Sequence, residues 1–161
     1  MADTGDGILH RIFVYGTLKK GQPNHNLITN PYNGTAIYIG KARSVDRWPL
    51  VVASALNIPV ILDKIGHGQE IQGELYDVDD NKLTSCDYLE DHPRWYLRRK
   101  IDVELSTKPV RREHVWAYVM HNFKEEFLDL PMLKSYDAED FKFILPSERS
   151  GFKDVISLFK R

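Results

Sequence analysis

The sequence has a single cysteine, Cys86, among its 161 residues. One cysteine excludes an intramolecular disulfide and a cysteine-based metal cluster, and it suits a reducing compartment. No apolar run approaches the roughly 20 residues that span a bilayer. The polar, acidic stretch 1–7 lacks the basic and apolar regions of a secretory signal. We therefore expect a cytoplasmic protein without a membrane anchor.

The chain also lacks an excess of charge of one sign, because 22 basic side chains stand against 23 acidic ones. Proteins whose main partner is nucleic acid or an anionic membrane normally carry a basic patch or stripe. The six histidines have no metal-ligand spacing, and no carboxylate accompanies them in a ligand pattern. We expect no nucleic acid, membrane or metal as partner, which leaves a small molecule as the default ligand.

What the chain does contain is a series of short apolar or alternating segments typical of β-strands. They cover residues 11–15, 36–45, 49–53, 58–62, 69–78, 96–105 and 114–120. Gly40 interrupts the second segment, and Gly73 predicts a bulge or a close backbone approach in the fifth. A helix is expected over residues 82–91, capped by the polar stretch 79–81 and stopped by Pro93.

The length indicates one domain with three parts. Residues 1–10 are expected to form a flexible arm, residues 11–149 the domain itself, and residues 150–161 an amphipathic helix. The irregular stretch 122–149 is rich in aromatic residues, and we expect it to wrap the sheet. The last helix could dock a partner, although packing on its own domain is the commoner role of such helices.

The first strand runs into a loop bounded by Gly16 and Gly21. Gly16 lets a ligand approach the main chain, and the following peptide N–H groups can then point at an anion. The two glycines have the spacing of a phosphate loop, but Gln22 and Pro23 stand where that motif needs Lys and then Ser or Thr. The loop therefore suits a smaller anion such as a carboxylate, or it is an ordinary turn.

Glu90 is the candidate for acid–base chemistry. At about 100° per residue it lies only about 20° round the helix from Leu83, and it follows Cys86 by one turn. A carboxylate on this apolar face is costly unless it is paired or used in catalysis. The alternatives are an ion pair with an arginine at position 94, 98 or 99, or a frayed helix end in solvent.

Several motifs together resemble one family. Residues 15–25 read Tyr-Gly-Thr-Leu-Lys-Lys-Gly-Gln-Pro-Asn-His, and further matches lie at 49–52, 57–59, 73–79, 89–90, Pro93, Tyr96 and, more weakly, 135–137. This order and spacing are similar to those of the γ-glutamyl cyclotransferase-like family, and most similar to its γ-glutamylamine cyclotransferase branch. The resemblance covers roughly residues 11–149.

The resemblance implies a fold and a site. The fold would be a small mixed α+β structure with a curved or barrel-like β-sheet and few helices. Residues Tyr15, Gly16, Thr17 and Leu18 would bind the γ-glutamyl group, with Tyr15 and Tyr136 lining the pocket. Glu90 would be the catalytic acid and base, and no cofactor would be needed.

The implied reaction is intramolecular aminolysis, which gives 5-oxoproline and a free amine. The branch suggests γ-glutamyl-ε-lysine, a remnant of degraded transglutaminase cross-links, as the substrate. Free γ-glutamyl amino acids would satisfy the same glutamyl pocket. A non-catalytic module that binds a γ-glutamyl metabolite or a protein partner is the alternative from another class.

Overall fold

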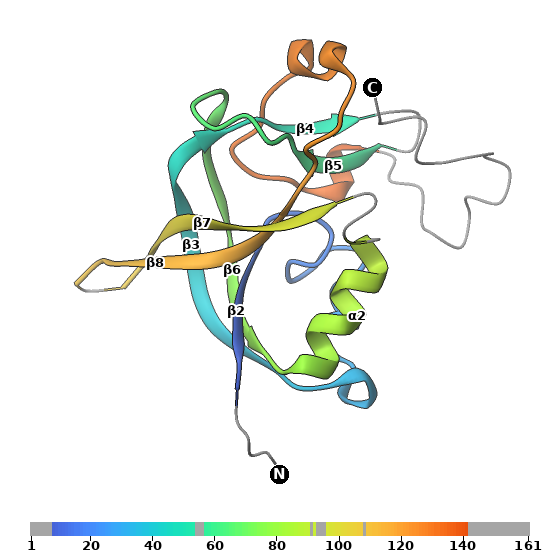
Figure 1. The fold of residues 1–161 in the computed structure, drawn as a ribbon, viewed down its shortest axis with the longest axis vertical. Coiled ribbons are helices and arrows are strands. Elements are labelled where there is room, and N and C mark those ends of the chain that lie inside the picture. The colour runs from blue at the N-terminus through green and yellow to red at the C-terminus, as the bar shows by residue number, and fades with distance from the viewer. Residues whose placement is uncertain (1–7, 54–56, 91, 93–95, 108, 142–161) are drawn as a thin grey trace, which may run out of the picture.

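The structure is a computed structural model that describes residues 8–53, 57–90, 92, 96–107 and 109–141. Figure 1 shows the course of the chain. The strands are β2 (His10–Val14), β3 (Ala36–Trp48), β4 (Leu50–Ala53), β5 (Ile58–Ile61), β6 (Gln69–Val78), β7 (Leu97–Leu105) and β8 (Arg111–Val119). The helices are α1 (His25–Thr29), α2 (Asp80–Glu90) and the 3-10 turns η1 (Pro31–Asn33), η2 (Glu125–Asp129) and η3 (Ala138–Asp140). The helix expected at 150–161 and the arm residues 1–7 lie outside the described residues.

The main sheet is a closed barrel in which the strands follow the order β2, β6, β3, β7, β8. Neighbouring strands are antiparallel, except that β2 and β8 meet in parallel through Ile12 and Trp116. In Figure 1, β3 and β6 run along the length of the molecule, and β7 and β8 cross them. The expected α+β fold with a barrel-like sheet and few helices is confirmed.

The curvature of the barrel comes largely from β3. Its pairing with β6 shifts register between Tyr38 and Gly40 and again between Arg43 and Arg47. Such irregularities bend a strand and increase its twist, so β3 can pair with β6 along its length and with β7 in its middle. Gly40 has a φ of 153°, a backbone conformation that side chains rarely adopt. The strand extends to Trp48, three residues beyond the expected segment.

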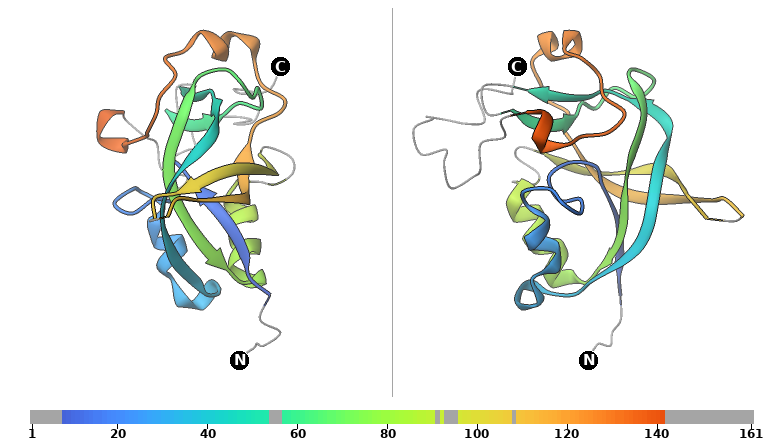
Figure 2. Two further views of the ribbon diagram at one scale, coloured as in Figure 1. Left: turned by 90° about the vertical axis from the view of Figure 1, so that its left-hand side faces the viewer. Right: turned by 180° about the vertical axis from the view of Figure 1, so that it is seen from behind.

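A small two-stranded sheet of β4 and β5 lies at one end of the barrel, and the stretch 121–141 passes around it. Figure 2 shows this stretch from two further sides. Main-chain hydrogen bonds join it to the rest: Leu133 N–H donates to the Leu50 carbonyl at 2.8 Å, and Gln72 N–H donates to the Lys134 carbonyl at 2.7 Å. The aromatic stretch therefore wraps the sheet as predicted, as far as residue 141.

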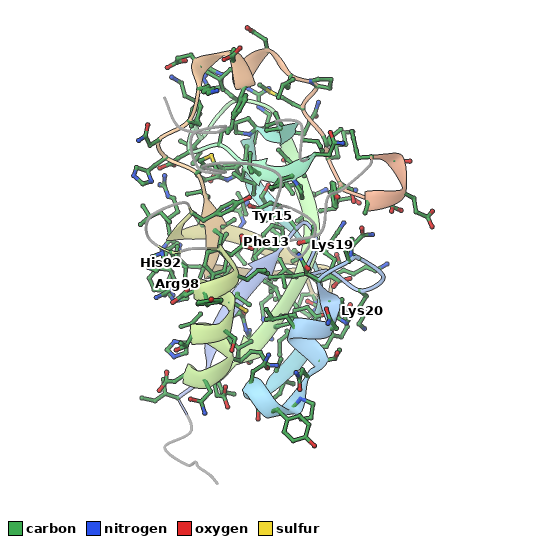
Figure 3. The ribbon with its side chains drawn as sticks, turned by 90° about the vertical axis from the view of Figure 1, so that its right-hand side faces the viewer. Phe13, Tyr15, Lys19, Lys20, His92 and Arg98 are labelled. Carbon is green, nitrogen blue, oxygen red and sulfur yellow. The ribbon has the colours of Figure 1, made fainter. Side chains whose placement is uncertain are left out.

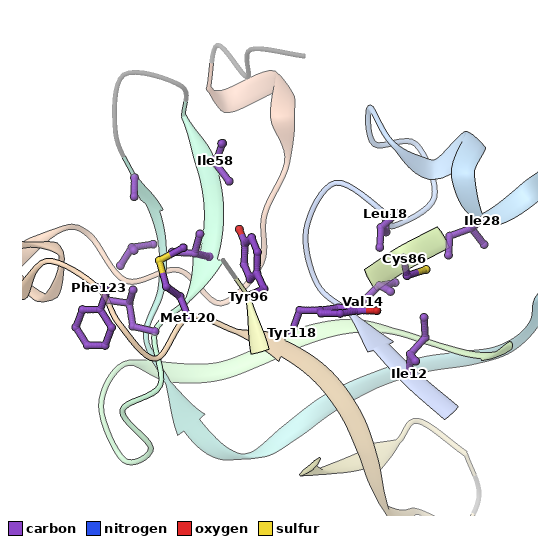
Figure 4. Packing of buried hydrophobic residues seen from close by; sticks show 14 of the residues in the cluster. Ile12, Val14, Leu18, Ile28, Ile58, Cys86, Tyr96, Tyr118, Met120 and Phe123 are labelled. Atoms are coloured by element: carbon purple, nitrogen blue, oxygen red, sulfur yellow. The ribbon is translucent and has the colours of Figure 1, made fainter. Parts of the chain in front are cut away.

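The helix α2 packs against the barrel beside β2 (Figure 1). The Asp79 side chain accepts from the Lys82 N–H at 2.8 Å, which satisfies a free donor of the first turn. Cys86 is fully buried (Figure 4), as predicted from its helix position. The buried Lys82 Nζ donates to the carbonyls of Leu27 and Asn30, and this ties α2 to α1. No helix in the described ranges has the length and apolarity to cross a bilayer.

Candidate active site

The loop that follows β2 forms one wall of a pocket. Gly16 lies against the ring of Pro59, so that a Cβ at Gly16 would stand only 3.0 Å from Pro59 Cγ. The loop closes on itself through the Lys19 N–H, which donates to the Gly16 carbonyl at 3.2 Å. Within the described residues, the N–H groups of Thr17 and Leu18 donate no hydrogen bond. These peptide groups are therefore available to an anionic ligand.

Tyr15 holds the start of this loop in place. Its ring is buried, and its hydroxyl donates to the Tyr118 carbonyl at 2.7 Å and accepts from the Ile61 N–H at 3.3 Å. Figure 3 shows Tyr15 in the interior with Phe13. One side chain thus joins the end of β2 to β8 and β5. Because both hydrogen bonds of the hydroxyl are internal, Tyr15 acts on the pocket mainly by positioning the loop and by forming part of its wall.

The end of α2 brings Glu90 to the same pocket. The pocket measures about 570 Å³, including its open mouth. It is lined by residues from β2 and the loop that follows it, from β5, α2 and β8, and from the position before β7: Phe13, Val14, Tyr15, Gly16, Thr17, Leu18, Asn24, Ile58, Pro59, Leu89, Glu90, Tyr96 and Tyr118. The structure therefore brings together Glu90 and the four loop residues predicted from the sequence.

The Glu90 carboxylate influences three buried groups through its charge. Burial raises the pKa of Tyr15, of Tyr118 and of the Cys86 thiol, and the negative charge of Glu90 raises all three further. For Cys86 the resulting pKa is about 12. Glu90 is the one charged side chain among the described residues that line the pocket. Among the described side chains of the lining, the Glu90 carboxylate is therefore the strongest proton acceptor.

Two tyrosines, Tyr96 and Tyr118, come from a part of the chain far from the loop and also line the pocket. The Tyr96 hydroxyl donates to the Pro59 carbonyl at 3.1 Å, and the Tyr118 hydroxyl donates to Asp87 Oδ1 at 2.6 Å. Arg98 Nε also donates to Asp87 Oδ1, at 2.7 Å. Figure 4 shows Tyr96 and Tyr118 within the same packed cluster, and Figure 3 places Arg98 near the end of α2. Hydrogen bonds thus hold both rings that wall the pocket.

Arginines near Glu90 in the sequence form ion pairs with other carboxylates. Arg98 pairs with Asp87, and Arg99 pairs with Asp63. Arg94 lies outside the described residues. Two of the three arginines near Glu90 in sequence thus have another carboxylate as partner.

Tyr136 occupies a different position from the other predicted site residues. It is fully buried, and it packs in one core cluster with Phe13 and Tyr15 but is not among the described residues that line the pocket. Burial, followed by the charge of Asp137, raises the pKa of Tyr136 to about 12. Its carbonyl accepts from Lys19 Nζ at 2.7 Å, so the segment of Tyr136 supports the loop.

Asn24 and Tyr118 are among the lining residues that were given no role from the sequence. Asn24 belongs to the motif at 15–25, so its place in that motif was the available signal. Tyr118 lies in a strand with no local motif, and only the closure of the barrel brings it beside Tyr15. Among the described residues, no group of three or more histidine, cysteine or acidic side chains is arranged to hold a metal ion.

Comparisons with known proteins agree with this geometry. The family model described as "Gamma-glutamyl cyclotransferase, AIG2-like" matches residues 12–138. Gamma-glutamylaminecyclotransferase C from Danio rerio is 38% identical over 146 residues, which are 87% of this chain and 96% of the relative. Gamma-glutamylaminecyclotransferase from Bos taurus is 36% identical over 137 residues, covering 85% of this chain and 81% of the relative.

A solved structure has a similar fold and sequence. The crystal structure of an AIG2-like protein from Mus musculus superposes with a TM-score of 0.78 at 38% identity, covering 81% of this chain and 90% of that one. The matched region contains the loop after β2, the helix α2, four of the five barrel strands in full, and β2 from residue 12 onward. From the family match and these identities, the chain belongs to the AIG2-like γ-glutamyl cyclotransferase family.

Proposed function

We propose that the protein is a cyclotransferase that converts a γ-glutamyl amine, with γ-glutamyl-ε-lysine as the preferred substrate, to 5-oxoproline and the free amine. The observation that carries this proposal is that Glu90 and the peptide N–H groups of the loop after Tyr15 line one pocket. The names of the relatives from Danio rerio and Bos taurus support the γ-glutamylamine substrate class.

The reaction requires little beyond positioning and proton transfer, because nucleophile and electrophile belong to one molecule. The α-amine nitrogen attacks the γ-carbonyl carbon and forms the ring C–N bond, and the C–N bond to the leaving amine then breaks. Glu90 takes a proton from the α-ammonium group and gives it to the leaving nitrogen. It then takes the second proton from the ring nitrogen, delivers it to the released amine, and ends as the carboxylate with which it began.

The loop would stabilise the charges on the substrate. The N–H groups of Thr17 and Leu18 would serve as preorganised donors, and such donors stabilise an oxyanion or a carboxylate without reorganising during the reaction. The walls formed by Ile58, Pro59 and Leu89 are apolar. They would exclude water from the folded glutamyl chain and pack against the alkyl part of the leaving amine.

The test is 5-oxoproline release by the purified protein from γ-glutamyl-ε-lysine, γ-glutamyl-alanine and glutathione. Glu90→Gln keeps the shape of the side chain but cannot carry the proton, so we expect turnover to fall by about 10²–10⁴-fold. Glu126→Gln, at an exposed position on η2, is the matched control and should match the unmodified protein.

The substrate panel separates the alternatives. Release from γ-glutamyl-alanine alone would keep the mechanism and move the substrate to free γ-glutamyl amino acids. If folded protein released 5-oxoproline from none of the three, the enzyme function for these substrates would be rejected in favour of a binding module. Equal rates for Glu90→Gln and Glu126→Gln would remove Glu90 from the mechanism.

A further inference from the structure

We propose that the Asn24 carboxamide and the Thr17 hydroxyl form a neutral clamp for the α-carboxylate of the γ-glutamyl group. The clamp would make Asn24 a specificity residue, because it selects ligands that carry this carboxylate. The inference deepens the proposed function and rests on it for the identity of the ligand. Three observations support it: the direction of the Asn24 side chain, the hydrogens left over in the pair, and the charge of the pocket.

The first observation is where the Asn24 side chain points. Asn24 is the N-cap residue of α1, and asparagine is favoured there because its side-chain oxygen accepts from an N–H of the first turn. Here the side chain makes no such bond. Instead Nδ2 donates to Thr17 Oγ1 at 2.9 Å, and both residues line the pocket. The side chain therefore makes no capping bond in the helix and is bonded instead to a second residue of the pocket lining.

The second observation is the count of donors. A carboxamide has two N–H hydrogens, and a hydroxyl can donate one hydrogen while it accepts another. Thr17 Oγ1 accepts from Asn24, so its own hydrogen remains for a ligand, together with the second Nδ2 hydrogen of Asn24. The Asn24 N–H also donates to the Thr17 carbonyl at 2.9 Å, and this second bond fixes the pair. The clamp therefore offers two donors held in place before a ligand arrives.

The third observation is the charge of the pocket. Its described lining contains no lysine or arginine, and Glu90 is negatively charged. Lys19 follows the lining residue Leu18, but its Nζ is engaged elsewhere, donating to Ser135 Oγ at 3.2 Å and to the Tyr136 carbonyl at 2.7 Å. Among the described residues that line the pocket, the donors offered to a bound carboxylate are therefore neutral ones. Hydrogen bonds from such donors to a charged acceptor are roughly twice as strong as those between neutral groups.

The experiment compares ligands that differ only in the carboxylate. Calorimetry would measure binding of 5-oxoproline and of 2-pyrrolidone, which is the same ring without the carboxylate. Kinetics would compare γ-glutamyl-ε-lysine with 4-aminobutanoyl-ε-lysine, which lacks the same group. The variants are Asn24→Ala and the nearly isosteric Asn24→Asp, with Asn26→Ala as the control, because Asn26 is exposed on the same helix.

We expect Asn24→Ala to weaken 5-oxoproline binding and to lower kcat/KM for γ-glutamyl-ε-lysine by about 10- to 100-fold, the effect of losing a hydrogen bond to a charged group. The two ligands without the carboxylate should change by no more than about twofold. Asn24→Asp should weaken 5-oxoproline binding more than Asn24→Ala does, because it places a negative charge beside the carboxylate of the ligand. It also carries the test if Asn24→Ala does not fold.

Three results would overturn the clamp. One is an equal loss for both members of each ligand pair, which is expected if Asn24 only supports the loop. Another is an unmodified protein that binds 5-oxoproline no more tightly than 2-pyrrolidone. The third is an Asn24→Asp variant that binds 5-oxoproline as well as the unmodified protein. If the protein releases no 5-oxoproline but its binding depends on Asn24 and the carboxylate, the proposed function fails and the clamp stands.

Discussion

Gly73 offers the sharpest test of how the barrel holds the site loop. A Cβ at this position would lie 2.4 Å from the Val14 carbonyl oxygen and 2.7 Å from two ring carbons of Phe13. Ordinary carbon–oxygen contacts in sheets are about 3.3–3.6 Å, so the strands would have to separate by roughly 0.9 Å. Neither obstacle moves easily, since one is main chain of β2 and the other is a ring that is 1% exposed.

The cost of Gly73→Ala follows from this geometry. Overpacking of a core typically costs about 1–3 kcal/mol, and the upper end applies when the obstacles are main chain and a buried ring. We expect the free energy of unfolding to fall by about 3 kcal/mol. For a chain of this size each kcal/mol lowers Tm by about 2–4 °C, which gives a loss of roughly 6–12 °C. Urea denaturation and a thermal scan would measure the two quantities.

The control for this prediction is Gly66→Ala. Gly66 has a φ of 95°, and nothing lies within 4 Å of a Cβ there, so the substitution tests backbone strain without a clash. That strain costs about 1–2 kcal/mol. A loss for Gly73→Ala of less than about 1 kcal/mol, or one no greater than for Gly66→Ala, would show that the close approach of β6 to β2 is not tight. Because Val14 precedes the loop, kcat/KM should fall with Gly73→Ala and stay unchanged with Gly66→Ala.

Two further predictions concern the end of α2. Tyr118→Phe removes the hydrogen bond to Asp87 and should lower the free energy of unfolding in urea by about 1–3 kcal/mol. Tyr88→Phe is the control, because that ring is 88% exposed, and it should change stability by less than about 0.5 kcal/mol. Equal effects of the two substitutions would refute the role of the bond. Because burial raises the pKa of the Cys86 thiol from 9.0 to about 12, the folded protein holds this proton where the unfolded chain has lost it, so stability should fall as pH rises from 9 to 12. Native protein at pH 8 should also react with a thiol reagent much more slowly than urea-unfolded protein, and rapid labelling of the native state would contradict the burial.

The strands were the most predictable part of the fold, because alternation follows directly from a half-buried sheet. The expected segment 69–78 and β6 have the same bounds. By contrast, β8 begins at Arg111, three residues before the expected start, where basic residues continue the main-chain ladder without adding an apolar pattern. At Gly73 the second of the two expected features, a close backbone approach, is confirmed, and the register shifts of this pair of strands lie elsewhere, at two places in β3.

In the candidate site, too, only the residues that a local sequence pattern marks could be predicted. Tyr15 and Glu90 could be selected in advance, one from a glycine-bounded loop motif and the other from its helix position, and both line the pocket. Tyr118 could not, because its proximity to Tyr15 depends on which strands close the barrel. The direction of the Asn24 side chain also depends on its contact with Thr17, which the preference of asparagine for helix caps does not predict.

The parallel contact between Ile12 and Trp116 means that the barrel can close only late in synthesis of the chain. During synthesis β2 emerges before the other strands of the barrel, and its second neighbour, β8, emerges as the last of them. Until then one edge of β2 remains open, and an open strand edge is a template for pairing with another chain. The segment that carries the loop of the pocket is therefore among the first to be synthesised and among the last to be enclosed.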